Sequence, residues 1–206
     1  MINPNKMLAS LETAAEKTAK ALVRRSDIRV VARGREAHYN WTTKTLVVPS
    51  YSIREDAEEK HVHAWRGLLD HECAHVEYSE GDVYDAHLLK WKKEDANAAK
   101  RMMKIANVFE DFMIERRWKE HNPGSVKHLA ACHDLVIDET GGAACCDPTF
   151  QPEGAPQPIG FFMALIQAML RVNTGHVAMS EVHPSIAMVL DYCADEIVVG
   201  LAAPDS

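Results

Sequence analysis

Two histidines that flank a glutamate are the residues of this sequence best suited to chemistry. Residues 71–75 read His-Glu-Cys-Ala-His, which places His71 and His75 four positions apart. Side chains at that spacing lie on one face of an α-helix, so both imidazoles can bind one tetrahedral zinc ion, Zn²⁺. Glu72 projects beside them and can accept a proton from a water that the ion activates. The motif predicts a catalytic zinc site, and two surface histidines on a helix are the alternative without chemistry.

A third ligand is expected from another helix, because catalytic zinc usually has three protein ligands and an open position for water. The apolar pattern of residues 94–120 predicts a buried helix. Glu110 falls within its apolar stripe, where a carboxylate is costly unless it is paired or binds a cation. We therefore expect Glu110 to be the third ligand, with Asp111 and Glu115 as alternative ligands and a buried salt bridge as the alternative role.

Two neighbours of Glu110 are expected to orient the ligands. Asp111 could accept a hydrogen bond from the outer nitrogen of a ligand histidine, which holds the ring in place and raises its basicity. Asn107, one turn before Glu110, could act similarly. A reaction intermediate with an oxyanion also needs a partner, and the sequence offers four candidates without a choice among them: Tyr78, His176, His183 and Tyr192.

These motifs resemble the zincin metallopeptidases of the gluzincin type, in which a His-Glu-x-x-His helix is followed by a helix with a ligand glutamate. The segment Asn107-Val-Phe-Glu110-Asp111 is similar to the Asn-x-x-Glu-Asp segment of CobT-like HExxH metallopeptidases of bacteria and phages. The resemblance covers roughly residues 28–118 and implies a zincin-like fold. It also implies that residues 44–49 form an edge strand that pairs with an extended substrate. Two departures are the long interval from His75 to Glu110 and Ile114, which stands where an aspartate is expected.

The predicted elements form one mainly helical α+β domain over residues 1–206. An N-terminal helix is expected in residues 1–27, and β-branched and aromatic residues predict a small antiparallel sheet in 28–50. The active-site helices fall within 55–121, where Trp65, Leu69, Cys73 and Val76 form one apolar stripe and Gly81 is a stop signal. Glycine and proline predict a loop in 138–158, followed by two C-terminal helices in 159–206.

Composition restricts the other classes of function. Lys and Arg number 23 against 30 Asp and Glu, and the formal net charge of −7 argues against nucleic-acid binding. The sequence has no candidate membrane span, and its five cysteines do not suggest a disulfide framework, so we expect a cytoplasmic protein. His61 and His63 are expected at an exposed helix start. The spacing of Cys132, His133, Cys145 and Cys146 does not suit a second zinc site.

The function expected from these residues is that of a zinc metalloendopeptidase. It would hydrolyse peptide bonds of a protein or peptide substrate by means of a metal-activated water. The alternative is a catalytically idle zincin-like module that binds a protein partner or serves an assembly. Glu72 favours the enzyme, because a scaffold has no evident need for a general base between two ligands.

Overall fold

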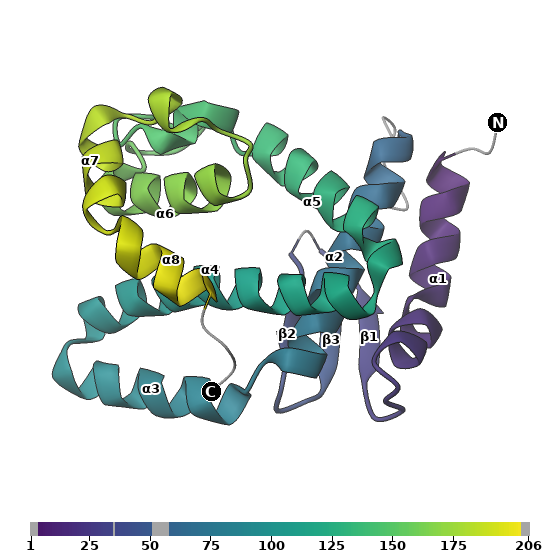
Figure 1. The fold of residues 1–206 in the computed structure, drawn as a ribbon. Helices are drawn as coiled ribbons and strands as arrows, with labels where there is room; N and C mark the ends of the chain where they lie inside the picture. Colours follow the sequence, from purple (N-terminus) through teal and green to yellow (C-terminus); the bar gives the residue numbers. More distant parts are fainter. Residues whose placement is uncertain (1–3, 35, 51–57, 203–206) are drawn as a thin grey trace. The chain divides into compact units, whose positions relative to one another are not determined.

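The computed structural model describes residues 4–34, 36–50 and 58–202 (Figure 1). They fall into two compact units. The first unit comprises Met1–Gly81 and Ile114–Leu135, and the second comprises Asp82–Met113 and Val136–Ser206. None of the helices in the described ranges has both the length and the apolar character needed to cross a bilayer.

The described residues are mainly helical, as predicted, and carry one small sheet. The first unit contains α1 (Pro4–Leu22), β1 (Arg29–Ala32), β2 (His38–Asn40), β3 (Thr45–Val48), α2 (Glu59–Tyr78), the end of α4 (Ala96–His121), η1 (Pro123–Ser125) and most of α5 (Val126–Glu139). The second contains nearly all of α3 (Gly81–Glu94), the start of α4, the last residues of α5, η2 (Gly142–Cys146), α6 (Gly160–Asn173), η3 (Met179–Glu181), α7 (Pro184–Tyr192) and α8 (Ala194–Ala202).

The sheet is mixed, which corrects the prediction of an antiparallel one. Its strand order is β1-β3-β2, with β3 parallel to β1 and antiparallel to β2. Residues 46–48 of β3 are all buried, whereas β1 and β2 each have exposed positions. A continuous apolar strand belongs in the centre of a sheet. The expectation that residues 44–49 form a free edge is therefore wrong, because β3 is paired on both sides.

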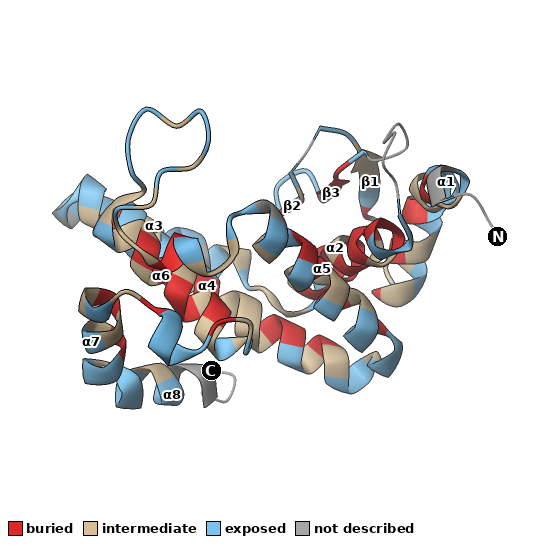
Figure 2. Cartoon of the chain, turned by 90° about the horizontal axis from the view of Figure 1, so that it is seen from above, coloured by how far each residue is buried: buried red, intermediate tan, exposed pale blue. Residues whose placement is uncertain are grey.

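Helix α2 packs against the sheet and α1 through the predicted apolar stripe (Figure 1). Trp65, Leu69, Cys73 and Val76 are all buried, which confirms that stripe. The indole Nε1 of Trp65 donates to the carbonyl of Pro49 at 2.8 Å, so the ring also joins α2 to the end of β3. Buried positions follow α2 in Figure 2. This packing determines which face of α2 remains for His71 and His75.

Several predictions about the helices need correction. Gly81 does not end α2, which stops at Tyr78, but is the first residue of α3, a separate helix in a region where we expected only two. The C-terminal segment forms α6, α7 and α8 rather than two helices. Helix α5 was not predicted, and the expected loop at 138–158 includes the short helix η2.

The second unit has its own apolar core around α6. Ala164, Ile166, Ala168 and Met169 of this helix are buried together with residues of α4, η2, α7 and the segment before α7. These partners are Val108, Cys146, Val177, Val182, Ile186 and Leu190. Figure 2 shows buried positions along α6. Asn107 and Asp111 therefore lie on a stretch of α4 that has its own packing partners.

In the first unit, Gly67 allows α2 and α5 to approach closely. A Cβ atom at residue 67 would clash with the carbonyl oxygen of His128 and would lie 2.7 Å from the Cβ of Cys132. Contacts this short are not tolerated, and the main obstacle is backbone, which cannot move aside as a flexible side chain can. Gly67 is therefore a packing requirement of the α2–α5 interface.

We predict that Gly67→Ala lowers the free energy of unfolding by about 1–3 kcal/mol, because it overpacks this interface. Helix propensity alone would act in the opposite direction, since alanine is favoured over glycine by about 1 kcal/mol. Urea denaturation monitored by circular dichroism measures the difference. Gly124→Ala is the matched control, because no atom lies within 4 Å of its added Cβ. Unchanged or increased stability of Gly67→Ala would contradict the close packing.

Candidate metal site

His71 and His75 lie one turn apart on α2, and each ring is held by its Nδ1 atom. Their ring centroids are 4.8 Å apart, in an edge-to-face arrangement. The Nδ1 of His71 lies 2.9 Å from Oε1 of Glu115, and the Nδ1 of His75 lies 2.8 Å from Oγ of Ser79. A partner at one ring nitrogen fixes the tautomer and the orientation of the imidazole. Nε2 is therefore the nitrogen with which each ring would bind a metal ion.

Glu115 joins three helices of the first unit through one buried carboxylate. Its Oε1 lies 2.9 Å from Nδ1 of His71 and 3.0 Å from Nε2 of His133, which belongs to α5. Lys119 donates to Oε2 at 3.1 Å from the next turn of α4. Burial by itself raises the pKa of Glu115, but the hydrogen bonds from His133 and His71 hold that pKa well below its usual range. Glu115 is thus ionised and able to orient His71.

Asp111 precedes Glu115 by one turn on the same uninterrupted helix. His71 and His75 belong to the first unit. Asp111 belongs to the second unit, and so does Glu110, which we expected as the third ligand. The role expected of Asp111, a hydrogen bond to a ligand histidine, is performed instead by Glu115.

The buried positions of α4 explain why we now prefer Asp111 to Glu110 as the candidate carboxylate of this helix. The buried residues of its second half are Ile114, Glu115 and Trp118, and Val108 is buried before them. Asp111 follows Val108 by three positions and precedes Glu115 by four, so it lies on the same helix face. Glu110 is turned about 100° from Asp111. Asp111, rather than Glu110, therefore shares a helix face with Glu115.

Asn107 lies where it can orient Asp111. Its Nδ2 donates to Oδ2 of Asp111 at 2.8 Å across one turn of α4. Both side chains line a groove of about 280 Å³ in the second unit, whose apolar lining includes Val108, Ile166 and Leu170. The expected supporting role of Asn107 is therefore directed at Asp111 and not at a histidine.

Glu72 is buried, with 3% of its surface exposed, and shares its surroundings with protonated thiols. Burial raises the pKa of Cys132 to about 12, and the charges of Glu115 and Glu72 raise it further. Burial likewise raises the pKa of Cys73, the residue after Glu72. Thiolate is the reactive form of cysteine, so neither thiol offers a nucleophile at neutral pH. Glu72 is the group here that is able to accept a proton.

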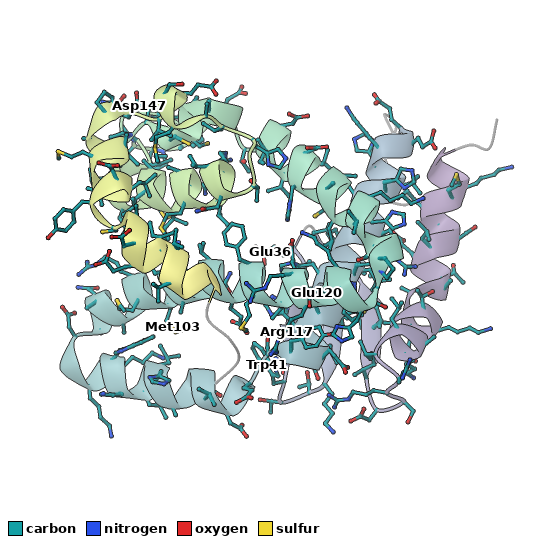
Figure 3. All side chains as sticks on the ribbon, viewed as in Figure 1. Glu36, Trp41, Met103, Arg117, Glu120 and Asp147 are labelled. Carbon is teal, nitrogen blue, oxygen red and sulfur yellow. The ribbon has the colours of Figure 1, made fainter. Side chains whose placement is uncertain are left out.

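An aromatic residue from the sheet side supports His75. Trp41, labelled in Figure 3, lies with its ring 6.5 Å from that of His75 in an edge-to-face arrangement. A Cβ atom on Gly81 would lie 2.9 Å from Cγ of this indole, so the start of α3 requires glycine beside it. Sequence analysis did not identify Trp41, because the packing joins residues that are 34 positions apart.

Three of the four candidates for oxyanion stabilisation have local partners. Tyr78 lies on α2, its hydroxyl 3.3 Å from Nδ1 of His121, and Arg117 stands 5.4 Å from its ring centroid. In the second unit, Nδ1 of His176 lies 2.7 Å from Oγ1 of Thr174. His183 caps the start of α7, where its ring accepts from the backbone of Ser185, and Tyr192 is 87% exposed. The choice among these four remains a prediction.

Sequence analysis missed His133 and Ser79 and considered Glu115 only as a ligand. His133 had been weighed together with three cysteines, but in the structure its ring contacts Glu115. Its signal was weak because α5 itself was not predicted. Ser79 follows His75 by four residues, a spacing that suits a contact across one helical turn.

Comparison of the chain with protein-family models, with curated proteins and with solved structures gives no match.

We predict that Glu115→Ala weakens Zn²⁺ binding about 10–100-fold, the usual effect of losing a carboxylate that orients a ligand histidine. The variant leaves His71 able to rotate. Competition with a chromophoric chelator measures the affinity, and Glu120→Ala, an exposed glutamate on the same helix, is the control. Equal zinc affinity in Glu115→Ala and wild type would show that the hydrogen bond does not position a ligand.

Proposed function

We propose that this chain is a zinc-dependent metallopeptidase that hydrolyses peptide bonds in a protein or peptide substrate. The observation that carries the proposal is the arrangement of His71 and His75. Both imidazoles are oriented through Nδ1 within the first unit, by Glu115 and Ser79, and their ring centroids are 4.8 Å apart, which suits two ligands of one ion. Two surface histidines without a function would not need a buried carboxylate to orient them.

The chemistry of the donor set supports zinc as the metal. Two imidazoles and one carboxylate are the ligands of many catalytic zinc sites, which leave a fourth position for water. Calcium and magnesium prefer sites made of oxygen ligands and are poorly suited to a histidine pair. His71 and His75 match this preference, with a carboxylate of α4 as the proposed third ligand.

Glu72 provides the general base of the proposed reaction. When bound, zinc lowers the pKa of a coordinated water to about 7 and polarises the carbonyl of the substrate. The Glu72 carboxylate takes a proton from the attacking water as the new C–O bond forms. It then transfers that proton to the amide nitrogen as the C–N bond breaks, so that the products are a carboxylate and an amine. Its burial keeps the carboxylate away from bulk water.

The identity of the third ligand is tested by a pair of neighbouring variants. We predict that Asp111→Ala greatly reduces zinc affinity, because Asp111 shares a helix face with Glu115, the partner of His71. Glu110→Ala, one position earlier on α4, should bind zinc like wild type. Zinc stoichiometry and affinity after dialysis are the measurements. If Glu110→Ala loses the metal and Asp111→Ala retains it, the assignment of the third ligand is reversed.

The activity itself is tested by Glu72→Gln, which keeps the shape of the side chain and removes the base. We predict that this variant binds one equivalent of zinc at His71 and His75 as wild type does, but hydrolyses peptides ~10²–10⁴-fold more slowly. A quenched-fluorescent peptide library provides the substrate, and Glu77→Gln on the same helix is the control. Full activity of Glu72→Gln would refute its role as the base. Zinc-loaded wild type that cleaves no peptide would favour the alternative of an idle, partner-binding module.

A further inference from the structure

A second pair of histidines joins α2 and α5 away from the site described above. His63 of α2 and His128 of α5 have ring centroids 5.1 Å apart, and their Nδ1 atoms are separated by 3.2 Å. His63 precedes Gly67 by one turn, and the same close approach that Gly67 permits brings the backbone of His128 against α2. Both residues belong to the first unit.

The expectation that His61 and His63 form an exposed helix start is wrong for His61 and incomplete for His63. His61 is buried, and its Nδ1 accepts from the backbone N–H of Glu58 at the beginning of α2. His63 is partly exposed and faces His128. The two rings thus have different roles, and only His63 is directed at another imidazole.

The separation of the two Nδ1 atoms suits two ligands of one metal ion. Zinc–nitrogen bonds are about 2.0–2.1 Å long, so an ion bound to both atoms at the observed spacing would make an N–Zn–N angle of roughly 100°. That angle is close to tetrahedral. Without a cation, one ring must donate its proton to the other, whereas a cation accepts lone pairs from both.

The neutral form of His128 also favours metal binding. Burial lowers the pKa of His128 to about 4, and the charges of His63, Arg66 and Lys127 lower it further, so this ring is neutral at pH 7. Glu59 lies one turn before His63, with Oε1 3.8 Å from its Nε2. A negative charge beside the pair favours the approach of a cation.

Charges of both signs surround the histidine pair, with Arg66 and Lys127 on the positive side. Arg66, the nearest guanidinium on α2, is paired with Asp70, with its Nε 3.0 Å from Oδ1. Glu59 offers a negative charge on the same helix, and its side chain is 82% exposed. The His63 side chain is 36% exposed, so an ion can reach it from solvent.

We propose that His63 and His128 form a second, weaker site for a divalent transition-metal ion of the Zn²⁺, Ni²⁺ or Cu²⁺ class, which bridges α2 and α5. Imidazole suits all three ions. With two protein ligands, water completes the coordination. This site does not depend on the proposed peptidase function, because it uses different residues and needs no reaction.

Zinc titration of the full chain at pH 7, monitored by calorimetry with Zn²⁺ as the probe, tests this assignment. Wild type should bind two equivalents, and His63→Ala and His128→Ala should each bind only the tighter one. His38→Ala, an exposed histidine of the same unit on β2, is the control and should retain both. His71→Ala should lose the tighter equivalent and retain the weaker one.

The outcomes separate this proposal from the first one. If His63→Ala and His128→Ala both bind as much zinc as wild type, the second site does not exist. If His71→Ala binds as much zinc as wild type while the His63 and His128 variants lose an equivalent, the second site stands and the proposed peptidase centre fails. Should His128→Ala not fold, His63→Gln decides alone, because its partly exposed side chain can be replaced without opening the core.

Discussion

The hydrogen-bonding requirement of one buried carboxylate organises the first unit around its histidines. An ionised carboxylate taken out of water needs donors, and Glu115, 6% exposed, receives them from three helices. His71 comes from α2, His133 from α5, and Lys119 from the next turn of α4. Since the same contact orients His71, the stability of the unit and the geometry of the candidate metal site depend on one group.

Close packing of helices makes this arrangement possible. Gly67 has no side chain to separate α2 from α5, so α5 approaches near enough for His128 to meet His63 and for His133 to reach Glu115. On the other side of α2, the Trp65 stripe is anchored to the sheet, and the indole of Trp41 packs against His75. The histidine face of α2 is thus defined by contacts on two sides, which is the preorganisation that a metal site needs.

Local residue patterns predicted the helix of the motif and its buried stripe, because a period of 3.6 residues is visible in a single segment. They did not predict the direction of β1 relative to β3, since alternation within a strand carries no information about its neighbours. The choice between Glu110 and Asp111 depended on which side of α4 is buried. That side is determined by the tertiary partners of Val108, Glu115 and Trp118. The apolar stripe drawn through other residues of the helix predicted Glu110, one position before Asp111. Ser79, Trp41 and His133 act through contacts that no motif encodes.

The most direct measurement for the central claim is anomalous diffraction at the zinc absorption edge from crystals grown with Zn²⁺, with His63→Ala as the crystallised variant so that one site is expected. A single peak about 2.0–2.1 Å from Nε2 of both His71 and His75, with a carboxylate oxygen of α4 in the same coordination sphere, is the predicted result. A zinc peak elsewhere, or none beside these two imidazoles, would contradict the metal site and the peptidase proposed from it.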